Sequence, residues 1–121
     1  MDENTDGHPA RYALLRALWR DAIDGWSAPG ALEQLPAARR LLAAGADRED
    51  LARLARAVAY EAVFMATETL DHGQDAAAPG AGWTLLETGG DGEPTGRPLD
   101  GLHEDLLALD PSGHDGADLW A

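Results

Sequence analysis

The chain has 121 residues, a length that fits one domain, and it carries 22 acidic side chains against 9 arginines and no lysine. Its formal net charge of −13 argues against a nucleic-acid binder, because basic side chains supply most of the affinity for phosphates. The absence of cysteine and lysine excludes disulfides, thiolate and zinc–thiolate chemistry, Schiff-base catalysis and the phosphate-loop lysine.

The charge is unevenly distributed along the chain. Residues 1–70 have a net charge of −3, whereas residues 71–121 have a net charge of −10 and contain Arg97 as their only basic side chain. The second segment also holds most of the glycines and prolines. We therefore expect one domain over residues 1–121, with a helical half, a loop-rich acidic half, and flexible ends at residues 1–7 and 112–121.

The beginning of the chain is acidic and polar, unlike a signal peptide, and no apolar run approaches the roughly 20 residues of a membrane span. We expect no contact with a membrane and a cytoplasmic location. Abundant alanine with arginine in place of lysine is typical of a GC-rich coding sequence, which suggests a bacterial origin.

Two helices are expected in the first 45 residues. Apolar residues at three- and four-residue spacing predict a helix from about residue 9 to 24, with Asp6 as its N-cap and Gly25 as its stop. A second, short helix is predicted over residues 36–44, with Gly45 just after its end.

The strongest pattern predicts a central helix over about residues 48–72, capped by Asp47 and ended by Gly73. It has two apolar stripes, and Tyr60 and Phe64 form the smaller one. We expect the other stripe to be its main packing face, with the first helices on one side and the C-terminal half on the other. That main stripe comprises Leu51, Leu54, Ala55, Val58, Ala62, Met65, Ala66 and Thr69.

The acidic half is expected to hold a β-hairpin over about residues 83–99, followed by a short helix over 102–109. A hairpin is only marginally stable by itself, so we expect it to pack on the central helix. The predicted fold class is mainly α (α+β): a three-to-four-helix domain with the central helix 48–72 and the hairpin 83–99.

Several polar residues could carry chemistry. Glu61, Glu68 and His72 lie near one line of the central helix, and Glu68 and His72 have the i, i+4 spacing at which two ligands can meet one metal. His103 could join them, which makes Glu68, His72 and His103 the metal-ligand candidates. The favoured interpretation is a solvated helix face, and no cofactor is predicted. A partly buried Glu61 would need a partner, for which Arg97 is the candidate.

Two features near the end of the chain bear on its structure and function. The run from Asp110 to Gly116 is typical of a tight hydrogen-bonded turn and lacks the pattern of a calcium loop or a nucleophile site. Trp120 either folds back onto the domain or anchors a partner, and folding back is favoured.

The small size and strong acidity are similar in a general way to immunity proteins that neutralise toxins, although no motif identifies a family. We therefore expect a protein-interaction module, immunity- or inhibitor-like, that binds a basic partner protein through its acidic half. The residues expected to bind the partner are Asp91, Glu93, Asp100, Glu104, Asp105 and Trp120.

Two alternatives stay open. One is a small metal-dependent or acid/base enzyme that uses Glu61, Glu68, His72 and His103, although the chain offers no recognisable nucleophile. The other is a non-catalytic structural or accessory subunit, or a homodimer formed through the aromatic face of the central helix.

Overall fold

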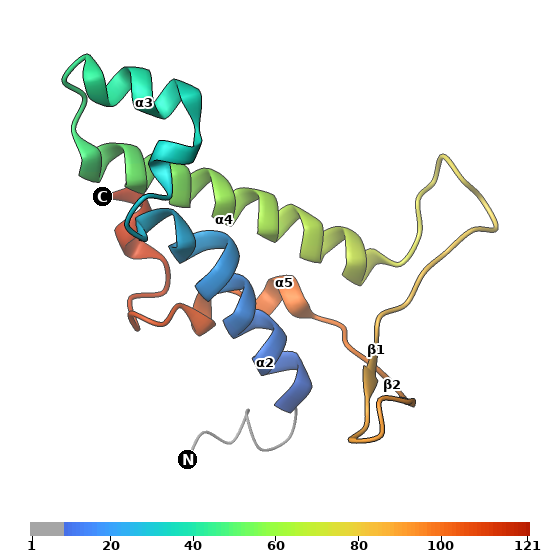
Figure 1. The fold of residues 1–121 in the computed structure, drawn as a ribbon. Helices are drawn as coiled ribbons and strands as arrows, with labels where there is room; N and C mark the ends of the chain where they lie inside the picture. Colours follow the sequence, from blue (N-terminus) through green and yellow to red (C-terminus); the bar gives the residue numbers. More distant parts are fainter. Residues whose placement is uncertain (1–8) are drawn as a thin grey trace.

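The computed structural model describes residues 9–121 and shows a mainly α fold with one β-hairpin, which confirms the predicted fold class (Figure 1). Asp6 and the expected flexible end at residues 1–7 lie outside the described residues. The helices and strands are α2 (Pro9–Ala17), α3 (Pro36–Ala43), α4 (Arg48–His72), β1 (Leu86–Thr88), β2 (Pro94–Pro98) and α5 (Leu102–Asp105). Short π and 3-10 segments are η1 (Leu18–Ile23), η2 (Asp24–Ser27), η3 (Leu32–Gln34), η4 (Leu107–Leu109) and η5 (Ala117–Trp120).

The first helix extends slightly further than predicted, because α2 runs directly into the π-helical η1 and the 3-10 turn η2. Leu15, Trp19 and Ile23 follow one another at intervals of four residues, and all three are fully buried. In a regular α-helix each such step drifts by about 40° around the axis. The wider π turn takes more residues per turn and offsets part of this drift, which keeps the three side chains on one side.

The predicted ends of α4 are confirmed. The Asp47 carboxylate accepts a hydrogen bond from the Asp50 backbone N–H at 3.0 Å, which is an N-cap contact. Gly73 ends the helix in the left-handed conformation, with φ of 77°. Gly45 follows α3 with φ of 99°, as expected for the residue after a helix end.

The packing of α4 reverses our prediction about its two apolar stripes. Tyr60 is buried between the Trp19 and Phe64 rings, at centroid distances of 5.8 and 6.2 Å. The expected main stripe is instead exposed: Leu54 and Val58 retain 61% of their accessible surface, and Met65 retains 55%. The prediction was wrong because η1, η2, α5 and η5 all pack on the aromatic side of α4, where buried Leu102, Leu106 and Leu119 complete the core.

The β-hairpin forms within the predicted range, with β1 and β2 antiparallel and Leu86 opposite Pro98. It packs against α2, and not against α4 as expected. The loop before the hairpin contacts α4 instead: Trp83 Nε1 donates to the Thr69 carbonyl at 3.1 Å. The hairpin therefore stands beside the start of the first helix, and this placement forms the cavity described below (Figure 1).

The last part of the chain closes the core around Asp110. Its two carboxylate oxygens accept the Ser112 and Gly116 backbone N–H groups at 2.9 and 2.8 Å, which confirms the predicted hydrogen-bonded turn. Leu119 is buried in the core, whereas Trp120 places one edge of its ring against Tyr60 and remains 57% exposed. The Trp120 side chain thus folds back onto the domain, and more than half of its surface still faces solvent.

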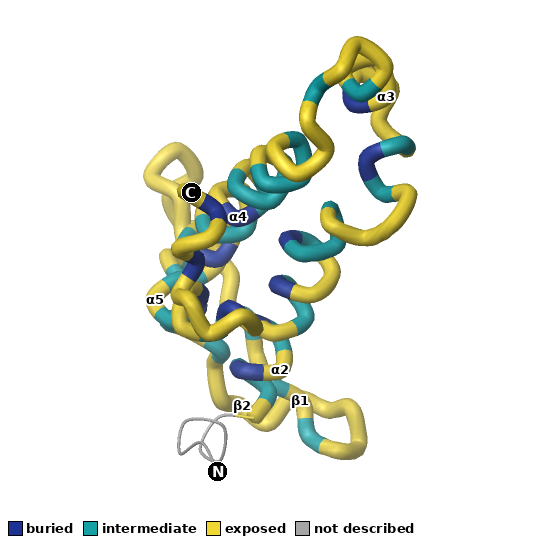
Figure 2. Tube along the Cα trace, turned by 90° about the vertical axis from the view of Figure 1, so that its left-hand side faces the viewer, coloured by how far each residue is buried: buried dark blue, intermediate teal, exposed yellow. Residues whose placement is uncertain are grey.

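Figure 2 shows that the buried positions lie where the helices face one another, and that the hairpin and the region around α3 are mostly exposed. Among the described helices, none combines the length and the apolar character needed to cross a bilayer.

Candidate functional site

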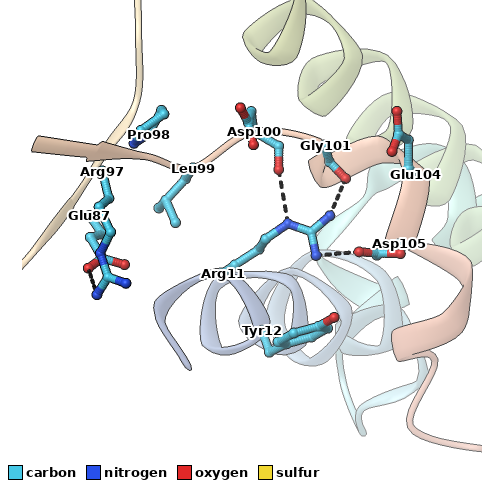
Figure 3. Close-up of a pocket in the computed structure, with 10 residues that line it drawn as sticks. All are labelled: Arg11, Tyr12, Glu87, Arg97, Pro98, Leu99, Asp100, Gly101, Glu104 and Asp105. Carbon is cyan, nitrogen blue, oxygen red and sulfur yellow. Dashed lines mark hydrogen bonds and ion pairs between the residues drawn. The ribbon is translucent and has the colours of Figure 1, made fainter. Parts of the chain in front are cut away.

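A cavity of about 520 Å³ lies between the hairpin, the start of α2 and the turn into α5 (Figure 3). Its walls carry four carboxylates and two arginines, so they have a net charge of −2. Three of the residues predicted to bind a partner line it, namely Asp100, Glu104 and Asp105. The remaining lining residues are Arg11, Tyr12, Glu87, Arg97, Pro98, Leu99 and Gly101.

Arg11 forms one wall of the cavity and connects α2 to the turn before α5. Its Nε donates to the Asp100 carbonyl at 2.9 Å and its Nη2 donates to the Gly101 carbonyl at 2.5 Å, and the guanidinium also forms an ion pair with Asp105 (Figure 3). Gly101 has φ of 65°, and a Cβ there would lie 3.1 Å from Arg11 Nη2. Glycine at this position therefore serves both the backbone conformation and the close approach of the arginine.

The second arginine of the cavity is also paired. Arg97 Nη2 lies 2.6 Å from Glu87 Oε1, in an ion pair between the two strands of the hairpin. The Glu87 side chain is only 11% exposed and also accepts a hydrogen bond from the Thr95 hydroxyl at 3.2 Å. The predicted Glu61–Arg97 pair is therefore wrong: cross-strand pairing holds Arg97 in the hairpin, and Glu61 is exposed on α4.

Asp100 and Glu104 differ from the other charged residues of the cavity. Within residues 9–121, neither carboxylate forms a hydrogen bond or an ion pair with another side chain, and neither points at the Arg11 guanidinium in Figure 3. Both arginines of the cavity are held by other carboxylates. The uncompensated negative charge of the cavity thus belongs to Asp100 and Glu104.

The other predicted partner-binding residues lie outside the cavity. Asp91 and Glu93 occupy the exposed hairpin turn, where the Asp91 carboxylate accepts the Glu93 backbone N–H at 3.0 Å. Trp120 belongs to η5, and Figure 1 shows the C-terminal end of the chain on the other side of the molecule from the hairpin. The structure therefore places the acidic candidates along the hairpin and the cavity, and it separates Trp120 from them.

His103 belongs to a pair that the sequence did not reveal. Its Nδ1 lies 2.5 Å from Asp71 Oδ2, and its backbone N–H donates to the same oxygen at 2.9 Å. The Asp71 side chain is 7% exposed, and its Oδ1 is buried without a hydrogen-bond partner among the described residues. The imidazole is also packed edge-on against Phe64, at a centroid distance of 5.7 Å.

The two partners shift one another's titration in opposite directions. The hydrogen bond to Asp71 raises the pKa of His103, and the nearby carboxylates of Asp71, Glu104 and Glu68 act in the same direction, against a smaller opposing effect of burial. Burial works to raise the pKa of Asp71, but the hydrogen bonds from His103 and from the backbone outweigh it together, so this pKa is lowered. Both shifts therefore favour the ionised forms of the two side chains over their neutral forms.

The remaining candidates for metal binding or acid/base chemistry are dispersed. Glu61 is exposed, whereas Glu68 and His72 line a shallow cavity of about 380 Å³ near the end of α4. His103 lies against Asp71 and Phe64 instead. No three acidic or histidine side chains of residues 9–121 gather in a way that could hold a metal ion.

Sequence reasoning missed Arg11 and Asp71. Arg11 could not be singled out, because its partners are backbone carbonyls about 90 residues away. Asp71 offered a usable signal: an acidic residue in the last turn of a helix opposes the helix dipole, so it calls for a specific partner elsewhere.

We compared the chain with protein families, with curated proteins and with solved structures, and none of the three comparisons found a match.

Proposed function

We propose that the protein is an interaction module, immunity- or inhibitor-like, that binds a basic partner protein through its acidic half. The observation that carries this proposal is the pair Asp100 and Glu104, whose carboxylates line a cavity in which both arginines are already neutralised. A Lys or Arg side chain of a partner would find there the counter-charge that the protein itself leaves uncompensated.

The rest of the acidic half supports the same proposal. Asp91 and Glu93 at the hairpin turn extend the negative surface beyond the cavity. Residues 71–121 carry a net charge of −10, and such a field speeds the approach of a basic protein before any contact forms. Arg11 and Gly101 hold the backbone below the two carboxylates, so the cavity is formed before the partner arrives.

The test is affinity capture of the partner from the native host, followed by a binding titration. The variant D100N/E104Q removes two negative charges from the cavity without changing side-chain size. We expect it to raise the Kd for the captured basic protein at least about tenfold. The matched control is E61Q/D115N, which removes two exposed carboxylates away from the cavity and should leave the Kd within about twofold.

The Kd values of the two double variants separate the effect of the cavity from the effect of total charge. An equal loss of affinity in both double variants would show that total charge matters and the cavity does not. Capture of no basic protein at low salt, where steering is strongest, would overturn the proposal as a whole.

A further inference from the structure

Aspartate followed directly by glycine is a reactive pair of residues. The backbone nitrogen of the glycine can attack the side-chain carboxyl carbon of the aspartate and close a five-membered succinimide ring, and the missing glycine side chain leaves that approach open. The chain has five such pairs, which begin at Asp6, Asp24, Asp91, Asp100 and Asp115. The first lies outside the described residues, and the fold treats the other four differently.

In two of these four pairs, residues that are distant in sequence or buried hold a reacting group. Asp24 Oδ1 accepts two hydrogen bonds from Arg56, at 3.1 and 2.9 Å, which fix the carboxyl group that would be attacked. The pair at Asp115 is restrained at the nitrogen, because the Gly116 N–H donates to the buried Asp110 carboxylate at 2.8 Å. A nitrogen bound in this way attacks only after that hydrogen bond has broken.

The pair at Asp91 is restrained within the hairpin turn. Its carboxylate accepts the Glu93 N–H at 3.0 Å, and the Gly92 N–H donates to the Gly89 carbonyl at 2.9 Å. Both reacting groups are therefore engaged, although the turn is exposed. The local hydrogen bonds of this turn restrain the pair as the more distant partners restrain the other two.

The pair of Asp100 and Gly101 differs from the other three. Asp100 is exposed, and within residues 9–121 its carboxylate forms no hydrogen bond or ion pair. The Gly101 N–H likewise donates no hydrogen bond to another of these residues. Asp100 is thus the one described aspartate whose carboxyl group and following nitrogen are both unengaged.

Arg11 adds a contact that activates the nitrogen. Its Nε donates at 2.9 Å to the Asp100 carbonyl, which belongs to the same peptide bond as the Gly101 nitrogen. Attack requires this nitrogen to lose its proton, and the resulting negative charge is shared with the carbonyl oxygen. A hydrogen bond from a charged guanidinium favours that charged form, because charge-assisted hydrogen bonds are stronger than neutral ones.

We infer that Asp100 is the site at which the folded chain converts aspartate to isoaspartate. In the first step the Gly101 nitrogen bonds to Asp100 Cγ, the bond from Cγ to its hydroxyl oxygen breaks, and that hydroxyl leaves with the amide proton as water. In the second step a water molecule adds to one of the two carbonyl carbons of the ring and breaks its bond to nitrogen. Opening at the former main-chain carbonyl gives isoaspartate, and opening at Cγ restores aspartate.

The isoaspartate has a longer main chain and a displaced carboxylate. The main chain then runs through Cβ and Cγ of residue 100, and the free carboxylate is the former main-chain carbonyl group, which Arg11 already contacts (Figure 3). The modified residue would therefore pair its charge with Arg11. The cavity would keep Glu104 as its one carboxylate without a counter-charge among the described residues.

Peptide mapping by electron-transfer mass spectrometry tests the site, because it measures isoaspartate separately at each position after incubation at about 37 °C and neutral pH. In the folded chain we expect position 100 to convert at least about tenfold faster than positions 24, 91 and 115, a factor that corresponds to one ordinary hydrogen bond. The control is the chain unfolded in guanidinium chloride. Without the fold, the four positions should convert at rates within about threefold of one another.

Two arginine-to-glutamine variants test the contact of Arg11. R11Q removes the charge beside the Asp100 carbonyl, and we expect it to slow conversion at position 100 about tenfold. R20Q is the matched control, since Arg20 pairs with its neighbour Asp21 at the surface, and it should leave that rate within about twofold. Circular dichroism and urea unfolding verify that both variants fold.

Conversion in the folded chain that is no faster at position 100 than at positions 91 or 115 would overturn the inference. The same order of rates in the folded and the unfolded chain would also overturn it, because local sequence and not the fold would then select the site. An unchanged or higher rate in R11Q would refute the activating role of Arg11. The reaction needs no binding partner, so its failure and the failure of the proposed function are separate results.

Discussion

Asp71 and His103 join the end of α4 to the start of α5 across 32 residues of sequence. The carboxylate accepts both the ring and the backbone N–H of His103, so it fixes the position of α5 as well as the orientation of the imidazole. Burial would favour a neutral Asp71, but its hydrogen bonds favour the charged form. The pair therefore makes the stability of the fold depend on pH.

The sign of that dependence follows from the two pKa shifts. Because the pKa of His103 is raised on folding, its contribution is complete below about pH 6.5, the unfolded value, and disappears as the pH rises through the folded pKa. The pKa of Asp71 is lowered, so its contribution is present above about pH 3.9 and disappears as the pH falls through the folded pKa.

We therefore predict that the free energy of unfolding falls as the pH rises above about 6.5, and that H103Q removes most of this fall. Urea unfolding at intervals between pH 5.5 and 9 measures it. H114Q is the control: the hydrogen bond to Asp118 also raises the pKa of His114, but that ring is well exposed and should contribute less. A pH dependence that H103Q leaves unchanged would contradict the prediction.

At the scale of the elements, the turn from Asp110 to Gly116 shows how a loop without regular structure is kept rigid. Asp110 is buried and binds two backbone N–H groups, and Gly116 and Gly113 both have positive φ values, of 77° and 80°. The turn aims the following residues back into the core, where Leu119 packs.

Gly116 and Gly113 form a natural pair for a test. Alanine at either position would cost about 1 kcal/mol or more for the left-handed conformation. A Cβ at position 116 would also lie 2.6 Å from Leu107 Cδ2, whereas one at position 113 would have no atom within 4 Å. We predict that G116A lowers the free energy of unfolding by about 1 kcal/mol more than G113A does, measured by urea unfolding.

The double variant G116A/L107A checks the cause. If the clash with Leu107 is responsible, the extra loss in G116A should disappear in the L107A background. Additive losses would show that the strain lies elsewhere.

The ends of α4 were predicted correctly because caps are local: Asp47 and Gly73 act on the residues next to them. The inward face of α4 was not predicted, because the stripe that runs from Leu51 to Thr69 is as apolar as the aromatic one. The choice is made by distant partners, since Trp19, Leu102 and Leu106 pack around Tyr60 and leave Val58 exposed. The same limit applies to the cavity. Asp100 and Glu104 were candidates because of their charge alone. The sequence could not show that Arg11 and Arg97 pair with other carboxylates and so leave these two without a counter-charge.

At the scale of the whole molecule, residues 71–121 carry −10 of the formal net charge of −13. The ion pairs recorded within residues 9–121 neutralise only part of it. The folded chain therefore concentrates like charges that the unfolded chain keeps further apart, and this repulsion opposes folding.

We predict that salt stabilises the protein. Raising NaCl from 20 to 200 mM should increase the free energy of unfolding by about 1 kcal/mol, because the screening length falls to about 8 Å near physiological ionic strength. Urea unfolding is the suitable measurement, since urea is uncharged. The gain should level off above about 200 mM; a steady linear rise to 1 M would indicate a salting-out effect and contradict the prediction.

Trp19 Nε1 donates to the Leu106 carbonyl at 2.7 Å, a bond between residues 87 positions apart. The first helix and α5 thus enclose a core that neither completes without the other, although more than half of the chain separates them in sequence. During synthesis, α2 and α4 emerge from the ribosome with Leu15, Trp19 and Tyr60 still uncovered, until residues 102–119 have followed. Folding should therefore be slow for a small helical protein, and truncated nascent chains should be the form most exposed to proteases and aggregation.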